Sequence, residues 1–273
     1  MRTSLTLLAA LILMLAAAAP AAAAGTRGAT LSVAFPSDAK LGAEAPVRLR
    51  LAIDPRQLQK PVRQLQLRFP AALGIATSGL GAATCRRSAE EFAAVMIAGT
   101  GLAGCPPNAL MGRGTARAEV RLGARERADA LVIPEIANVA MLAAPARSDR
   151  FGLVFIANGL KPFGVTLAYD GHIAPAPPPF GGALVMDLRP VPNQFDADVA
   201  LTAIDFEIGA DDIRYRAPGS DGAWYQPEGI VLPDRCPRTG LLFHATLTFA
   251  DGSNADTRTT ARCPRAGARH RAT

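Results

Sequence analysis

The sequence predicts an all-β protein, an antiparallel β-sandwich with one short helix. Three observations predict it: runs in which apolar and polar side chains alternate, turn residues between these runs, and an Asp-Gly pair between two strand-like segments. Alternation with period two is typical of strands with one buried face, whereas βαβ units need helical segments between the strands. The 273 residues suffice for one large sandwich or for two packed sandwich modules.

The first half of the chain contains the clearest alternation. Strand-like runs lie at residues 30–35, 46–53, 62–69 and 115–122. In the last run, small or apolar residues alternate with charged ones: Ala116, Ala118, Val120 and Leu122 against Arg117, Glu119 and Arg121. Because successive side chains of a strand point to opposite faces, we expect these arginines on the solvated face of a sheet.

From residue 130 onward, short apolar runs follow one another with Gly, Pro, Asn or Asp between them. They lie at residues 130–133, 136–143, 151–157, 163–169, 183–188 and 199–207. Two more runs, at 241–249 and 257–262, flank Asp251-Gly252, which predicts a β-hairpin. Many short strands with turn residues between them are typical of a sandwich.

One segment, from Ser88 to about Ala98, predicts a helix. Ser88 and Glu91 have the spacing of a capping box, in which each side chain accepts a hydrogen bond from the backbone N–H of the other residue. Phe92 and the apolar residues that follow it recur at helical spacing. We expect a single short helix among the strands.

The chain has four cysteines, Cys85, Cys105, Cys236 and Cys263. In an oxidising compartment this even number predicts disulfides, for which three connectivities exist. The pairs Cys85–Cys105 and Cys236–Cys263 close the shortest loops, each worth about 3 kcal/mol in the chain-entropy model, and we prefer them. Zinc is the alternative, but neither pair has the short spacing of a zinc knuckle. We expect no metal and no cofactor.

Residues 1–24 have the order of a secretory signal peptide: a charged start, an apolar stretch from Leu5 to Ala18, and small residues up to Ala24. The apolar stretch is shorter than the roughly 20 residues that span a bilayer, so we expect cleavage and no membrane span afterwards. The sequence therefore predicts a secreted protein, either extracellular or held in the periplasm or cell envelope.

The exported chain divides at its most polar join, residues 123–129, into an N-terminal β module (25–125) and a C-terminal β module (126–265). Residues 266–273 are expected to form a disordered basic tail. The chain has 29 Lys and Arg against 23 Asp and Glu, a mild excess that we do not assign to nucleic-acid binding.

Two motifs suggest chemistry, but their surroundings favour structural roles. Gly99–Gly104 matches G-x-G-x-x-G, yet a dinucleotide site needs a strand before the glycines and a helix after them, and here the predicted helix comes first. The carboxylates of a glycosidase must converge on one bond. Four acids lie close in the sequence, at Asp205, Glu207, Asp211 and Asp212. Their alternation with Phe206 and Ile208 predicts a strand with a polar outer face instead.

Three residues are the best candidates for ligand binding. Trp224 and Tyr225 are adjacent aromatics in a turn-rich segment, where an aromatic platform for a ligand would lie. His172 follows Asp170-Gly171, which predicts a turn, and it is the histidine best placed to serve a site. No catalytic residue is assigned.

The cysteine-proline motifs resemble those of a family. Cys105-Pro106-Pro107, Leu232-Pro233-Asp234-Arg235-Cys236-Pro237 and the terminal hairpin that closes at Cys263-Pro264 resemble secreted proteins of high-GC actinobacteria. The motifs are structural, and the resemblance implies no activity.

We therefore expect an exported, non-catalytic β-sandwich protein with a binding or structural role in the cell envelope or outside the cell. Its partner would be an envelope polysaccharide or another envelope protein. The alternative is a secreted hydrolase that acts on carbohydrate or ester substrates, for which His172 would need a carboxylate and a hydroxyl beside it.

Overall fold

The structure is a computed structural model that describes residues 28–54, 61–75, 83–94, 102, 104–122, 131–147, 150–188, 197–209, 213–216, 221–226 and 229–264. The expected signal peptide and basic tail lie outside these residues, and so do most of the G-x-G-x-x-G segment and two acids of the carboxylate group, Asp211 and Asp212. No helix in the described part is long and apolar enough to cross a membrane.

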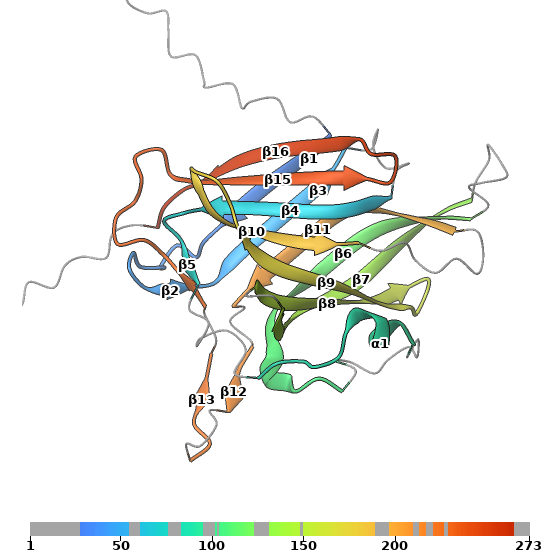
Figure 1. The fold of residues 1–273 in the computed structure, drawn as a ribbon, viewed down its shortest axis with the longest axis horizontal. Coiled ribbons are helices and arrows are strands. Elements are labelled where there is room, and N and C mark those ends of the chain that lie inside the picture. The colour runs from blue at the N-terminus through green and yellow to red at the C-terminus, as the bar shows by residue number, and fades with distance from the viewer. Residues whose placement is uncertain are drawn as a thin grey trace, which may run out of the picture.

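Eleven of the described strands form one antiparallel sheet (Figure 1). From edge to edge they are β1 (Ala29–Ala34), β3 (Val47–Ile53), β11 (Ala197–Ile208), β6 (Leu110–Leu122), β7 (Leu131–Arg147), β8 (Arg150–Lys161), β9 (Thr166–Pro175), β10 (Phe180–Asp187), β4 (Val62–Pro70), β15 (Leu241–Phe249) and β16 (Asn254–Ala261). The prediction of an all-β antiparallel fold is confirmed.

The large sheet folds over on itself, so that β4, β9, β10, β15 and β16 cross in front of β3, β6 and β11 in Figure 1. The two edge strands, β1 and β16, thereby come into contact. One face of every strand points inward, and buried residues such as Leu51, Phe155, Phe206 and Leu247 form the main core there. The fold is thus a sandwich made from one curved sheet.

The two modules expected from the sequence share this sheet. Strand β11, from the expected C-terminal module, lies between β3 and β6 of the expected N-terminal module. In the same way, β4 of the N-terminal module lies between β10 and β15 of the C-terminal module. Period-two alternation identifies strands but carries no information on which strands pair, so the polar join at 123–129 marks no boundary between sheets.

The remaining described elements are short. Strands β2 (Glu44–Ala45), β14 (Ile230–Val231) and β5 (Gly74–Ile75) form a three-stranded sheet, and β12 (Tyr215–Arg216) pairs with β13 (Trp224–Tyr225). A helix, α1 (Ala89–Ala94), and a 3₁₀ turn (Pro107–Ala109) lie in the segment between β5 and β6.

The segment with α1 covers the outer face of β7, β8 and β9. Phe92 is almost fully buried against Leu142, Val154 and Ile156, and the N–H of Cys85 donates to the carbonyl of Ala143 at 2.8 Å. This layer gives β7 and β8 a second buried face, which explains the continuous apolar runs in their sequences.

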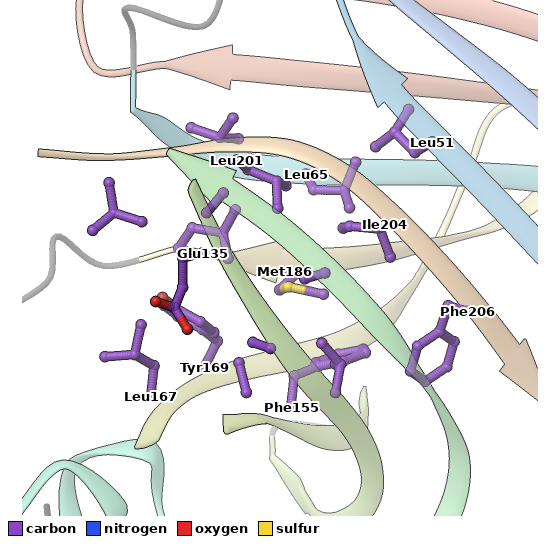
Figure 2. A pocket seen from close by; sticks show the side chains of 18 of the residues that line it. Leu51, Leu65, Glu135, Phe155, Leu167, Tyr169, Met186, Leu201, Ile204 and Phe206 are labelled. Atoms are coloured by element: carbon purple, nitrogen blue, oxygen red, sulfur yellow. The ribbon is translucent and has the colours of Figure 1, made fainter. Parts of the chain in front are cut away.

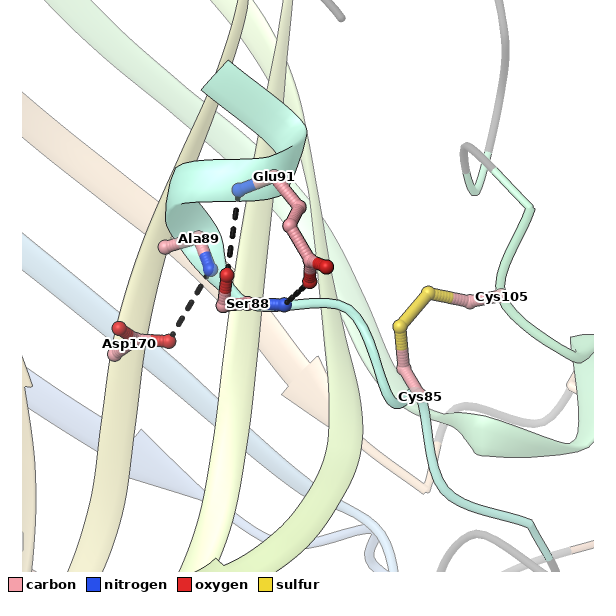
Figure 3. Close-up of a disulfide and its surroundings, with 6 residues drawn as sticks. All are labelled: Cys85, Ser88, Ala89, Glu91, Cys105 and Asp170. Carbon is pink, nitrogen blue, oxygen red and sulfur yellow. Dashed lines mark hydrogen bonds between the residues drawn. A yellow bond between two sulfur atoms is a disulfide. The ribbon is translucent and has the colours of Figure 1, made fainter. Parts of the chain in front are cut away.

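The start of α1 has the predicted capping box (Figure 3). The N–H of Ser88 donates to Oε2 of Glu91 at 2.7 Å, and the N–H of Glu91 donates to Oγ of Ser88 at 3.3 Å. The N–H of Ala89 donates to Asp170 of β9 at 3.4 Å, which ties the helix to the sheet. The expected helix is confirmed as far as Ala94, and the rest of its expected range lies outside the described residues.

Both preferred disulfides are present. Cys85 bonds to Cys105 beside α1 (Figure 3), and Cys236 bonds to Cys263 across the base of the β15–β16 hairpin. This hairpin turns at Asp251-Gly252 as predicted, since Gly252 has a φ of 81° and its N–H donates to the carbonyl of Phe249 at 3.0 Å.

Candidate functional site

The inward face of the large sheet lines a partly open cavity of about 640 Å³ (Figure 2). Its wall is formed by side chains from both halves of the folded sheet, including Leu51, Leu65, Met186, Leu201 and Ile204. The wall is predominantly apolar. Ligand pockets of small molecules have volumes of about 300–1,000 Å³ and mainly apolar walls, so the cavity has the size and character of a binding site.

The cavity exists because small residues replace large ones on the inward faces of three neighbouring strands. They are Ala116 and Ala118 of β6, Ala137 of β7, and Ala157 and Gly159 of β8. The register aligns them, since Ala116 pairs with Ala137 and Ala137 pairs with Gly159. Side chains of this size do not reach the opposite half of the sandwich, and the space between the two halves stays open.

The apolar wall makes this space a poor environment for water. The cavity is partly open, so water has access to it, but its wall offers few hydrogen-bond partners. An apolar molecule in this space would release that water and bury apolar surface.

The few charged residues that line the cavity lie at one end of it. Arg63, Glu135 and Asp198 stand near the starts of β4, β7 and β11, which run in the same direction in the antiparallel sheet. Toward the other end, a smaller adjoining pocket of about 70 Å³ is lined by apolar side chains and one glycine. The space between the sheet halves is polar at one end and apolar at the other.

Glu135 is the most buried of these charged residues, with 9% of its surface exposed. Its Oε2 accepts a hydrogen bond from the backbone N–H of Phe163 at 3.0 Å, in the turn between β8 and β9. Its Oε1 is buried without a hydrogen-bond partner among the described residues. Figure 2 shows the side chain within the cavity wall. A buried carboxylate oxygen that accepts no hydrogen bond costs free energy, because it has lost its hydration and gained no donor in exchange.

Tyr169 also lines the cavity, from strand β9 (Figure 2). Burial removes water from the phenol group and raises the pKa of Tyr169 to about 12. The hydroxyl therefore stays protonated at any physiological pH, and it can donate a hydrogen bond within the site.

Of the four carboxylates considered for a glycosidase, only Asp205 and Glu207 belong to the described residues. Asp205 lies on the outer face of β11, where it accepts from Nε of Arg48 and Nε of Arg50, each at 2.9 Å. The hydrogen bond from Arg48 and the two positive charges hold the pKa of Asp205 below its usual value. Phe206 and Ile208 point into the cavity instead, so the predicted strand with a polar outer face is confirmed.

His172 lies on the same outer side of the sheet, not in a turn. Strand β9 continues through Asp170 and His172, and the predicted turn at Gly171 is wrong. A Cβ atom on Gly171 would lie 2.8 Å from the ring of Phe155, so this glycine allows close packing within a strand. His172 Nε2 lies 3.2 Å from Nη1 of Arg150.

Trp224 and Tyr225 form β13, part of a short hairpin that projects beyond the end of the large sheet in Figure 1. Trp224 is 62% exposed, and the guanidinium of Arg216 lies 5.0 Å from its ring centroid. The structure therefore places Trp224 on a hairpin separate from β9, where His172 lies. The described residues also contain no group of three or more His, Cys, Asp or Glu that could hold a metal ion.

Comparison with known proteins gave no match: no family model, curated protein or solved structure is similar to this chain. The site is therefore defined by geometry alone, as an apolar cavity with one polar end inside an antiparallel β-sandwich.

Proposed function

We propose that this protein binds an apolar small molecule in the cavity between the two halves of its sheet, and that it does so after export. The observation that supports binding most strongly is the cavity itself: about 640 Å³, with apolar walls formed by aligned small residues on β6, β7 and β8. This agrees with the expectation of a non-catalytic binding protein. It moves the expected ligand from polysaccharide to an apolar molecule.

Export fits the same role. Two disulfides are stable in an oxidising compartment, and an apolar molecule that moves through an aqueous envelope needs a carrier that shields it from water. Expression of the full chain in a bacterial host, followed by N-terminal sequencing, tests this part. The proposal expects a mature N-terminus near Gly25.

Binding is tested with N-phenyl-1-naphthylamine, a dye whose fluorescence rises in apolar surroundings. The proposal expects saturable binding of one dye per chain. Ala137→Leu fills the cavity from β7 and should weaken binding about tenfold or more, which corresponds to about 1.4 kcal/mol. Ala52→Leu makes the same change at an exposed position of β3 and should leave binding unchanged.

Thermal unfolding of both variants shows whether the fold is kept. A folded Ala137→Leu protein that binds the dye as tightly as the unchanged chain would contradict the proposal, since the dye would then lie elsewhere. Absence of saturable dye binding to the unchanged chain would also contradict it.

A further inference from the structure

We propose that the ligand is an amphiphile, an apolar chain that ends in a hydrogen-bond donor, and that Glu135 binds this donor at the polar end of the cavity. The inference rests on the proposed function, because it names the class of molecule that the cavity takes. The donor is an alcohol hydroxyl or a protonated amine, and a carboxylate head group is disfavoured.

The first observation is the incomplete hydrogen bonding of Glu135. Oε2 has a donor, the N–H of Phe163 at 3.0 Å, whereas Oε1 has none among the described residues although it is buried. Buried polar atoms in folded proteins almost always have a partner, and an unpaired charged oxygen is especially costly. A ligand donor would supply the missing partner and gain a charge-assisted hydrogen bond.

The second observation is the free space around this carboxylate. Its cross-strand partner on β6 is Ala118, whose side chain is small. On the β8 side, a Cβ atom on Gly159 would clash with the carbonyl oxygen of Phe163 and lie 3.0 Å from Oε1, so the backbone of the β8–β9 turn packs closely there. The terminal torsion of a glutamate is broad, so a small rotation turns Oε1 toward the cavity. A head group therefore has room on the Ala118 side of Glu135.

The third observation is the distribution of charge along the cavity. The polar end has the carboxylate of Glu135 and the guanidinium of Arg63, whereas the adjoining pocket at the other end is apolar. Asp198 also borders the polar end, but it pairs in register with Arg121, on the outer face of β6. A chain with one polar end matches this gradient. A carboxylate head group placed beside the carboxylate of Glu135 is repelled by it, which makes the position selective against fatty acids.

The experiment uses four competitors with the same ten-carbon chain: decane, 1-decanol, decylamine and decanoate. Each is titrated against N-phenyl-1-naphthylamine bound to the purified full chain, with decane and 1-decanol kept below their solubility limits and decylamine and decanoate below their micelle concentrations. We expect 1-decanol and decylamine to bind at least about tenfold more tightly than decanoate and decane, the size of effect expected for a hydrogen bond to a charged group.

Two substitutions assign this preference to Glu135. Glu135→Gln keeps the shape but removes the charge, so decylamine should lose its advantage over decanoate. Glu135→Met removes the acceptor at similar length, so 1-decanol should bind no better than decane. The matched control is Glu119→Gln on the outer face of β6, where Glu119 lies 3.6 Å from Arg121, and it should keep the order of competitors.

The outcomes separate the two proposals. If the dye does not bind in the cavity, the proposed function fails. If the dye binds and all four competitors displace it equally, or decanoate is the best, the cavity binds apolar chains but the inference on the head group is wrong. If the preference exists and survives both Glu135 substitutions in folded protein, the assignment to Glu135 is wrong.

Discussion

Nε2 of His244 lies 3.1 Å from Oδ1 of Asp256, across the β15–β16 hairpin. On the other side of the ring, Nδ1 lies 3.0 Å from Nη1 of Arg68. A guanidinium has only donors, so Nδ1 accepts, and the ring is neutral with its proton on Nε2. Burial and the nearby arginines lower the pKa of His244.

This arrangement predicts a loss of stability in mild acid. The unfolded chain takes up a proton at His244 below a pH of about 6.5, whereas the folded chain resists protonation until a lower pH. The unfolded state therefore binds more protons in this window, and the free energy of unfolding should fall as pH drops below 6.5. Urea unfolding at pH 5, 6 and 7 measures the slope. His244→Gln should flatten it, and an unchanged slope would contradict the assignment.

Removal of the disulfide Cys236–Cys263 should lower the free energy of unfolding by a definite amount. It closes a loop with a sequence separation of 27, for which the chain-entropy model gives roughly 3 kcal/mol. The double variant Cys236→Ala/Cys263→Ala should lose about this free energy of unfolding in urea. Reducing agent should then lower its stability further through Cys85–Cys105, and insensitivity to reduction would show that this second bond does not stabilise the fold.

Substitution of Asp205 should change the stability of the fold only slightly, although Asp205 forms two ion pairs. The pairs with Arg48 and Arg50 are largely exposed, with 36% of the Asp205 side chain accessible, and surface salt bridges contribute about 0–1 kcal/mol. Asp205→Asn should therefore lower the free energy of unfolding by less than about 1 kcal/mol and leave dye binding intact. A loss of dye binding would place Asp205 in a site that the geometry does not show.

The position of Trp224 predicts that tryptophan fluorescence does not respond to ligand binding in the cavity. It is the single tryptophan of the chain, it is exposed, and it lies in the β12–β13 hairpin. Its emission should be that of a solvated indole and should not shift when the cavity fills. Trp224→Ala should keep the affinity for N-phenyl-1-naphthylamine, measured by dye fluorescence. Loss of affinity in this variant would favour the aromatic site that the sequence predicts.

The strands, the capping box, the disulfide pairs and the hairpin could all be predicted because each depends on residues close in the sequence. The cavity could not be predicted in this way. Ala116 and Ala118 show which face of β6 is apolar, but not that the opposite half of the sheet leaves a gap above them. That gap depends on how a curved sheet closes, which involves strands far apart in the chain.

Glu135 escaped prediction for a local reason. Pro134 before it suggests a break between the runs at 130–133 and 136–143, yet β7 continues through both. The last residue of β8, Lys161, pairs with Ile136 of β7. The residues of β7 before Ile136 therefore pair with β6 alone. Proline is tolerated at such an edge because no ladder bond is lost on the open side.

The closure of the sheet has a consequence for solubility. Free N–H and C=O groups on an edge strand recruit strands from other molecules and so begin aggregation. In this fold β1 and β16 lie against each other, with Val33 and Ala261 buried in one cluster, so each edge obstructs access to the other. At the open start of β7, where Leu131 and Val132 are exposed, Pro134 interrupts the row of donors. The same closure of the sheet that forms the cavity thus also protects its edge strands from pairing with other copies of the chain.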